Sequence, residues 1–240
     1  MERSVSCGDI ESVVKGLCLE ANTVLRPDVK EALARARDLE KEGTPPRQML
    51  DVLLENARIA LSEKIPLCQD TGMVAVFIEM GTQVAVRDGN LLAAVNAGVE
   101  KAYAEGNFRN SVAEDPILRR YTGNNTPAVI HLDLVEGERF SVSVMPKGFG
   151  SENKSRLVML NPTSTVEEIS GFCVETVKAA GPDACPPYVL GIGIGGTMET
   201  CALLAKKALL RPIGRRNDKA HLADIERRVI EGANALGIGV

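Results

Sequence analysis

A chain of 240 residues with 45% hydrophobic residues is long enough to bury a core, in one large domain or two small ones. Its 28 basic and 32 acidic residues give a formal net charge of −4 without a basic stripe, which argues against a nucleic-acid-binding protein. No apolar run approaches the ~18 residues of a membrane-spanning helix, and the first residues lack a signal-peptide pattern. We therefore predict a cytoplasmic protein without membrane association.

Helices and strands alternate through the first half of the chain. Apolar residues at helical spacing predict helices over residues 27–41 and 47–64, each followed by proline or glycine. The β-branched run MVAVFIEM predicts a strand at residues 73–80, and TQVAVR predicts a second strand at residues 82–87. Helical spacing returns over residues 90–106.

The second half of the chain continues this mixture. Residues 127–135 and 139–145 alternate in residue type around a Glu-Gly-Glu turn and predict a hairpin. Helices are predicted at residues 151–160, 166–180, 197–210 and 219–236, with a glycine-rich segment at residues 188–196. Strands and helices interleave without a strict βαβ rhythm, so we predict a mixed α/β (α+β) fold with short mixed-sheet strands, in one lobe or two.

Six cysteines without a secretion signal indicate buried thiols, metal ligands or catalytic thiols rather than disulfides. Cys18 and Cys173 lie on apolar helical stripes, which favours a structural role. Cys68 and Cys185 differ, because prolines flank each of them at the end of an element and keep the thiol out of a helix. Their spacing matches no local zinc or ferredoxin motif, so on spacing alone a metal-binding role and a structural role are equally open.

The stretch PLCQDTGMV places a carboxylate two residues after a thiol. In an extended segment, the side chains of Cys68 and Asp70 leave the same face of the chain, so a ligand and an acid or base could reach one substrate. The alternative is a tight turn, in which the side chains of Asp70 and Thr71 hydrogen-bond to the nearby backbone.

Two glycine-rich stretches raise the question of a bound anion. PKGFGSENKS brings Lys147, Gly148, Gly150 and Asn153 to a predicted helix start, where free N–H groups and lysines suit a carboxylate or phosphate. A capped glycine turn is the alternative there. GIGIGG has the glycine spacing of a nicotinamide-dependent oxidoreductase, but too few residues follow it for the rest of a dinucleotide-binding domain.

The order of these segments resembles the α region of the iron–sulfur hydro-lyases, the class I fumarate hydratases and L-tartrate dehydratases. The resemblance runs from about Asn22 to Val240 and is carried by PLCQDTG, NTPAVIHLDLVEGE, PKGFGSENKS, CPPYVLGIGIGG and AKKALLRPIG. It implies that Cys68 and Cys185 are two of three thiolate ligands of a [4Fe–4S] cluster, whose open iron acts as a Lewis acid.

The resemblance also implies the roles of the other residues. Asp70 would be the acid that serves the departing hydroxyl. Substrate-binding positions in this reading are Gln69, Thr71, Arg109, Lys147, Gly148, Gly150 and Asn153. The substrate would be a C4 dicarboxylate, with fumarate and malate interconverted or tartrate converted to oxaloacetate.

A partner and a further cluster ligand are implied as well. The general base belongs to a β subunit in this family, so an α2β2 assembly is expected. The third cysteine ligand is expected beyond Val240, with Cys201 or Cys173 as less favoured substitutes. Residues 1–240 would then form one hydro-lyase α region that lacks the family's C-terminal segment. The alternative is a truncated or accessory α-region protein without a competent cluster.

Overall fold

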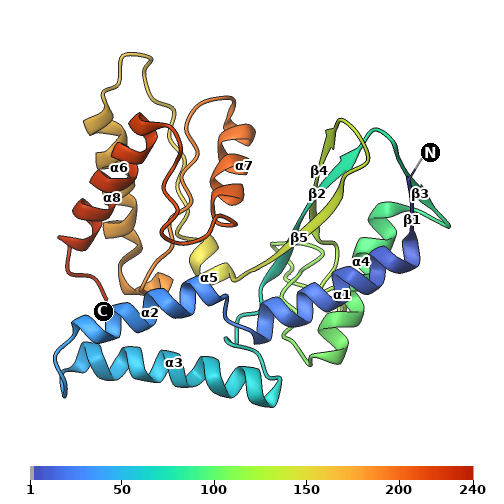
Figure 1. Ribbon diagram of the computed structural model, residues 1–240, viewed down its shortest axis with the longest axis horizontal. Coiled ribbons are helices and arrows are strands. Elements are labelled where there is room, and N and C mark those ends of the chain that lie inside the picture. The colour runs from blue at the N-terminus through green and yellow to red at the C-terminus, as the bar shows by residue number, and fades with distance from the viewer. Residues whose placement is uncertain (1–2, 240) are drawn as a thin grey trace. The chain divides into compact units, whose positions relative to one another are not determined.

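The computed structural model describes residues 3–239 and has the mixed α/β class that the sequence predicts. The chain divides into two compact units (Figure 1). Unit 1 consists of Met1–Arg26 and Glu55–Phe149, and unit 2 consists of Pro27–Leu54 and Gly150–Val240. Among the described residues, no helix combines the length and the apolar character needed to cross a bilayer.

A three-stranded sheet lies at the centre of unit 1. Strand β2 (Met73–Gly81) is the middle strand, with β4 (Val129–Val135) parallel on one side and β5 (Phe140–Lys147) antiparallel on the other. A separate parallel pair joins β1 (Arg3–Ser6) to β3 (Val84–Arg87). The strands predicted at residues 73–80 and 82–87 are therefore confirmed.

Two helices pack against each other and complete the core of unit 1 (Figure 1). Helix α1 (Cys7–Thr23) is capped by Ser6, whose hydroxyl accepts a hydrogen bond from the backbone amide of Asp9. Helix α4 (Leu91–Glu105) is capped by Asn90, whose side chain accepts a hydrogen bond from the backbone amide of Ala93. The fully buried side chains of this core include Val14, Cys18, Val74, Val76, Val95 and Val99. Burial raises the pKa of the Cys18 thiol to about 12, as expected for a structural cysteine.

The predicted hairpin between residues 127–135 and 139–145 is wrong, because β2 lies between the two strands. The apolar run of β2 is buried along most of its length, and the middle position in the sheet pairs both edges of this strand with neighbours. The turn after β4 crosses the end of β2, where Gln83 N donates to Gly137 O at 2.9 Å. A Cβ on Gly81 would lie 2.1 Å from that carbonyl oxygen, so this crossing requires glycine.

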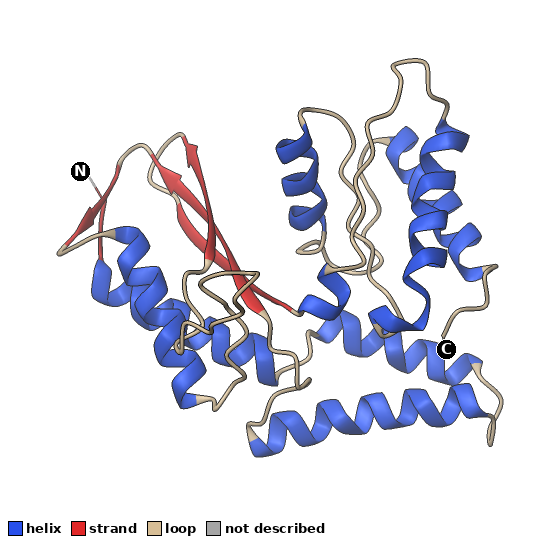
Figure 2. Cartoon of the chain, turned by 180° about the vertical axis from the view of Figure 1, so that it is seen from behind, coloured by secondary structure: helices blue, strands red, loops and turns tan. Residues whose placement is uncertain are grey.

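Unit 2 is mainly helical. It holds α2 (Pro27–Leu39), α6 (Val166–Ala180), the 3₁₀ turn η1 (Gly181–Ala184), α7 (Met198–Ala208) and α8 (Ala220–Asn234), while α3 (Pro45–Glu63) begins in unit 2 and ends in unit 1. Helices α6 and α8 pack together, and their buried residues include Val177, Ile225 and Val229. A capping box of Thr165 and Glu168 starts α6. Figure 2 shows long loops running beside α7.

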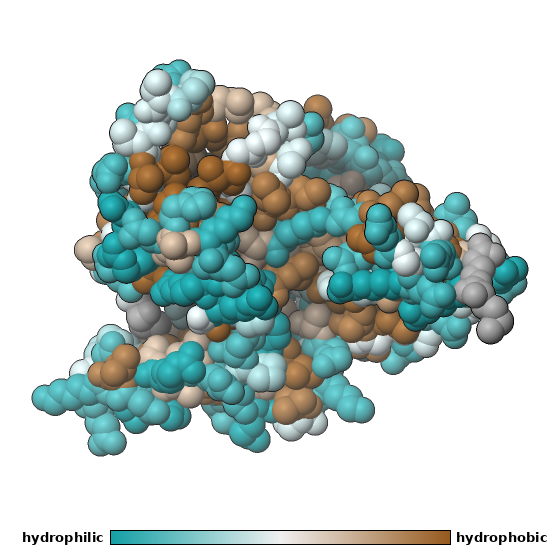
Figure 3. All heavy atoms as spheres, turned by 45° about the horizontal axis from the view of Figure 1, so that its top comes forward, coloured by the Kyte–Doolittle hydropathy of each residue, from teal (hydrophilic) through white to brown (hydrophobic). Residues whose placement is uncertain are grey.

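The helix predicted at residues 151–160 is wrong. Helix α5 (Phe149–Glu152) is a single turn, and the chain continues as a loop to residue 165. The four apolar residues 157–160 would face all sides of a helix, so one helical face could not bury them. Figure 3 shows apolar side chains at the surface on the side of the view where unit 2 lies. The exposed apolar residues of unit 2 include Leu157, Val158, Met159, Leu160, Val189, Leu190 and Ile194.

Candidate functional site

The predicted thiol–carboxylate segment connects α3 to β2 in unit 1. Leu67 N donates to Asn22 O at 2.8 Å, and Asn56 Nδ2 donates to Leu67 O at 2.9 Å, so the start of the segment is fixed to α1 and α3. Cys68 and Gln69 are exposed. The amide of Asp70 donates to Cys68 Sγ at 3.4 Å, a backbone contact of the kind that tunes the sulfur ligands of metal clusters.

The end of the segment is buried and ordered by the backbone. Thr71 is 3% exposed, and its hydroxyl donates to Arg109 O at 3.1 Å. The phenol of Tyr103 donates to Thr71 O at 2.6 Å. Gly72 has φ +61°, and a Cβ there would lie 2.1 Å from Lys147 O. The Thr71 hydroxyl therefore bonds to the backbone 38 residues further along the chain and not to nearby backbone, which differs from the predicted tight turn. Cys68 and Gln69 stay accessible.

The carboxylate of Asp70 lies against the start of the predicted anion-binding stretch. A Cβ on Gly148 would lie 3.0 Å from Asp70 Oδ2, so the absence of a side chain there leaves room for the carboxylate. Lys147 ends β5, and its Nζ donates to Gly148 O at 3.3 Å. The fold thus brings Asp70 together with Lys147 and Gly148, as the substrate-site hypothesis requires.

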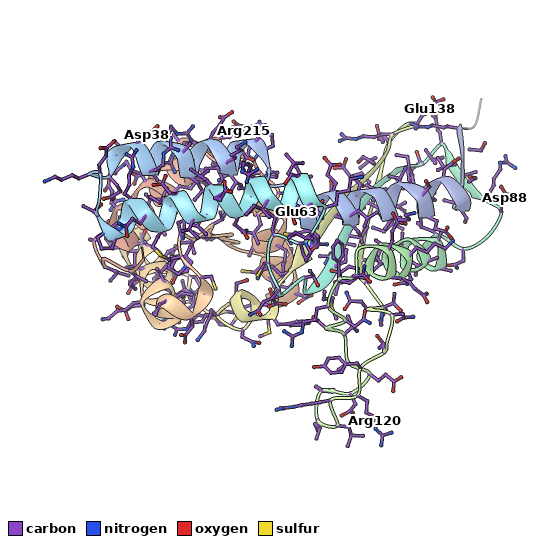
Figure 4. The ribbon with its side chains drawn as sticks, turned by 90° about the horizontal axis from the view of Figure 1, so that it is seen from below. Asp38, Glu63, Asp88, Arg120, Glu138 and Arg215 are labelled. Atoms are coloured by element: carbon purple, nitrogen blue, oxygen red, sulfur yellow. The ribbon has the colours of Figure 1, made fainter. Side chains whose placement is uncertain are left out.

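Arg109 lies in the loop after α4, next to the Cys68–Gly72 segment. The ring of Phe108 is buried and packs edge-on against Tyr103, with ring centroids 5.4 Å apart. Arg109 itself is exposed, and its carbonyl accepts the Thr71 hydroxyl. The loop that follows carries Arg120 at its far end, where Figure 4 shows it extending away from the strands.

Asn125 is a residue of this cluster that the sequence did not single out. Its side chain is fully buried, and Oδ1 accepts the amides of Ser111 at 2.7 Å and Val112 at 3.2 Å. Its Nδ2 donates to Gly72 O at 3.0 Å. The hydroxyl of Ser111 is also buried and, within residues 3–239, has no hydrogen-bond partner. Asn125 is the first residue of the stretch NTPAVIHLDLVEGE, which carries the family resemblance but assigned it no role. Asparagine tolerates the left-handed backbone, with φ +58°, that it adopts here.

The remaining predicted site residues lie in unit 2. Cys185 is exposed and has φ +59° after η1, a left-handed conformation that is strained for a residue other than glycine and is found most often at functional sites. Gly150 lies within α5, and exposed Asn153 follows it. Lys154 Nζ binds Asp183 Oδ2 at 3.0 Å, which ties this stretch to η1 just before Cys185.

The structure does not contain the regular helix start that the predicted anion site would use. Helix α5 is only four residues long, so its start offers no regular array of free N–H groups, and Lys154 is engaged by Asp183. Cys201, in the first turn of α7, donates its thiol proton to Gly193 O at 3.0 Å and is partly buried. A hydrogen bond of this kind is typical of a structural thiol.

The donor chemistry of Cys68 and Cys185 suits iron and sulfide, because both are free, exposed thiols and soft thiolates are the usual ligands of iron–sulfur clusters. Among residues 3–239 there is no group of three or more His, Cys, Asp or Glu side chains arranged to hold a metal ion. The described residues therefore supply two suitable donors, and no complete set of ligands.

Comparison with known proteins gives consistent matches over nearly the whole chain. The model of the fumarate hydratase (Fumerase) family matches residues 11–240. A Methanocaldococcus jannaschii protein, provisionally named L(+)-tartrate dehydratase subunit alpha, is 39% identical over 236 residues, which cover 96% of this chain and 82% of that protein. The L(+)-tartrate dehydratase subunit alpha of Escherichia coli K12 is 29% identical over 233 residues, which cover 96% of this chain and 76% of that protein. The protein of the same name from Shigella sonnei matches equally well.

Proposed function

Because the chain belongs to the fumarate hydratase (Fumerase) family, we propose that it is the α subunit of a hydro-lyase acting on a C4 dicarboxylate. The observation that carries this proposal is the Cys68–Gly72 segment, which presents a thiol and a carboxylate two residues apart and is held by backbone hydrogen bonds. The tartrate dehydratase names of the relatives and the fumarate hydratase name of the family support two substrates, tartrate and fumarate.

We assign Cys68 and Cys185 as ligands of a [4Fe–4S] cluster, since both are exposed free thiols. When bound, such a cluster supplies a Lewis-acidic iron that polarises a substrate hydroxyl or carboxylate. We do not assign the third thiolate to Cys201, because its thiol is engaged by Gly193 O. The assignment of Cys68 and Cys185 does not depend on Cys201.

In this proposal, residues of unit 1 transfer the proton and provide the positive charges that bind the substrate carboxylates. In dehydration, Asp70 would give a proton from a carboxyl oxygen to the departing hydroxyl, which leaves as water, and in hydration it would take that proton back. The guanidinium of Arg109 and the ammonium of Lys147 would bind the substrate carboxylates, with Gln69 as a further polar contact. Gly148 leaves the space that the Asp70 carboxylate occupies. The base that removes the carbon-bound proton would come from a β subunit, in an α2β2 assembly.

Anaerobic reconstitution with iron and sulfide tests the cluster assignment. We expect the wild-type chain, produced with its β partner, to bind iron and sulfide and to convert L-tartrate or hydrate fumarate. Cys68→Ser and Cys185→Ser should each lose iron and activity, while Cys173→Ser, a partly buried helix cysteine, should keep both. Wild-type iron content in both ligand variants would refute the assignment and favour the accessory-protein alternative. The cytoplasmic location stays a prediction.

A further inference from the structure

Three chain segments meet at the buried side chain of Asn125, and we propose that Asn125 is the positioning residue that fixes the Asp70 segment against the Arg109 segment. The inference rests on the proposed function, because it concerns how the two predicted substrate-contacting residues are held. Neither the family resemblance nor the motifs assign a role to this residue. It lies outside the Cys68–Gly72 motif in sequence and enters the site from the loop before β4.

The hydrogen bonds of Asn125 divide between the two segments. Its Oδ1 accepts the amides of Ser111 and Val112, which follow Arg109, and its Nδ2 donates to the carbonyl of Gly72, which follows Asp70. Each polar atom of the amide is therefore used, and each is used on a different segment. Because the side chain is fully buried, water cannot replace either set of bonds without local opening.

Two other side chains contact these segments. The Thr71 hydroxyl donates to Arg109 O, and the Tyr103 phenol donates to Thr71 O at 2.6 Å and also lies 3.4 Å from Gly72 O. Only the Asn125 amide binds the backbone after Arg109 and the Gly72 carbonyl together, among the hydrogen bonds described above. A shift of about 1 Å in catalytic geometry is enough to lower turnover about 100-fold, so loss of this bridge has a measurable effect on the reaction.

The substitutions must separate the bridge from the backbone strain at this position. Asn125 has φ +58°, where alanine is strained, so Asn125→Gly removes the side chain without that cost. Asn125→Asp keeps an acceptor for the Ser111 and Val112 amides but removes the donor to Gly72 O. Asn110→Ala is the matched control, because Asn110 Nδ2 donates to Gly123 O at 2.9 Å in the same loop, is exposed and makes no bond to the Asp70 segment.

Steady-state kinetics of the cluster-loaded enzyme with L-tartrate and fumarate form the first readout. We expect Asn125→Asp to lower kcat about 30- to 100-fold with KM within about 3-fold, since Asp70 loses its support while the Arg109 side keeps its bonds. Asn125→Gly should lower kcat and raise KM together. Asn110→Ala should stay within about 3-fold of wild type in both constants, with unchanged iron content in all variants.

Hydrogen–deuterium exchange gives a readout that does not depend on turnover. The amides of Ser111 and Val112 should stay protected in Asn125→Asp and lose protection in Asn125→Gly, while a peptide spanning residues 68–74 should exchange faster in both. Wild-type kcat in Asn125→Asp, or equal losses in Asn110→Ala, would overturn the proposal. If the loaded wild-type enzyme converts neither acid, the proposed function fails, and unchanged exchange at residues 68–74 in both Asn125 variants would then overturn the positioning role as well.

Discussion

The two units of the chain have similar lengths but very different interiors. Of the buried apolar residues within the described range 3–239, 18 lie in unit 1 and 5 in unit 2, and the connected core cluster belongs entirely to unit 1. Unit 2 exposes apolar segments at residues 157–160 and 189–194, and ion pairs such as Lys154–Asp183 and Lys206–Glu152 hold parts of it together. The segment that carries Asp70 thus rests on the well-packed unit, whereas Cys185 follows a 3₁₀ turn in the unit with the smaller core.

The difference between the two interiors indicates which residues of the candidate site are held in fixed positions. A close-packed core holds backbone positions to a fraction of an ångström, as an acid that must meet a departing hydroxyl demands. The exposed thiol of Cys185, on a strained turn, has no comparable support from a packed core. The following comparisons between the two units test this interpretation.

The largest contrast concerns the predicted substrate residues of the two units. Asp70→Asn should lower kcat about 1000-fold with iron content unchanged, because the amide cannot give or take the proton. Asn153→Ala, which removes an exposed polar side chain in unit 2, should lower kcat/KM less than about 10-fold. Anaerobic assays with L-tartrate and fumarate measure both. A loss for Asn153→Ala as large as that for Asp70→Asn would place part of the essential chemistry in unit 2.

The second contrast concerns packing. Val76→Ala removes two methyl groups from the centre of β2, where the side chain is 0% exposed, and should lower the free energy of unfolding by about 2–3 kcal/mol. Val189→Ala makes the same change at a site that is 50% exposed and should cost less than about 0.5 kcal/mol. Urea unfolding of the two variants decides this, and equal costs would contradict the difference between the interiors.

The third contrast tests the ion pairs of unit 2. The Glu226 carboxylate binds Arg211 and accepts the amide of Asn217, and its side chain is only 18% exposed. Glu226→Gln should lower the free energy of unfolding by about 1–2 kcal/mol, because it weakens the pairing of two partly buried donors, the Arg211 guanidinium and the Asn217 amide. Glu175→Gln removes an exposed pair with Lys178 and should cost less than about 0.5 kcal/mol. Thermal unfolding at low and high salt measures both.

The smallest expected effect is a pH dependence in the core of unit 1. Burial raises the pKa of Cys18 from 9.0 to about 12, so between these values the unfolded chain loses the thiol proton while the folded chain keeps it. Stability from this thiol is therefore complete below pH 9 and falls as the pH rises toward 12. The stability difference between wild type and Cys18→Ala should narrow by about 1 kcal/mol at pH 10. A difference independent of pH in urea titrations would contradict the burial argument.

Local sequence patterns predicted most elements correctly but failed where distant segments compete. The apolar runs of α3, β2, α4 and α6 carry their own periodicity, so their predictions are confirmed. The hairpin prediction failed because the residue alternation of β4 and β5 fits pairing with each other and with β2 equally well, and burial of β2 decides between them. The helix predicted at 151–160 failed because a run of four apolar residues has no single helical face.

The candidate site shows the same limit. The motif predicted which residues of the Asp70 segment take part in the site. The fold adds that Gly148 and the carbonyl of Arg109 lie next to that segment. The role of Asn125 was not predictable, because its hydrogen bonds join segments that are far apart in sequence. The roles of Cys68 and Cys185 stay predictions, which the reconstitution experiment tests.

The position of β2 between β4 and β5 has a consequence for how the polypeptide acquires its structure. Met73 pairs with Lys147 and Ala75 with Val129, with all of residues 82–128 between β2 and its partners. Non-local pairings of this kind form slowly, because the entropy cost of closing a long loop comes before the favourable free energy of the strand contacts. During synthesis, Gly72 cannot meet the Lys147 carbonyl until β5 has left the ribosome. The thiol of Cys68 therefore emerges long before β4 and β5, the two strands that complete the sheet next to its segment.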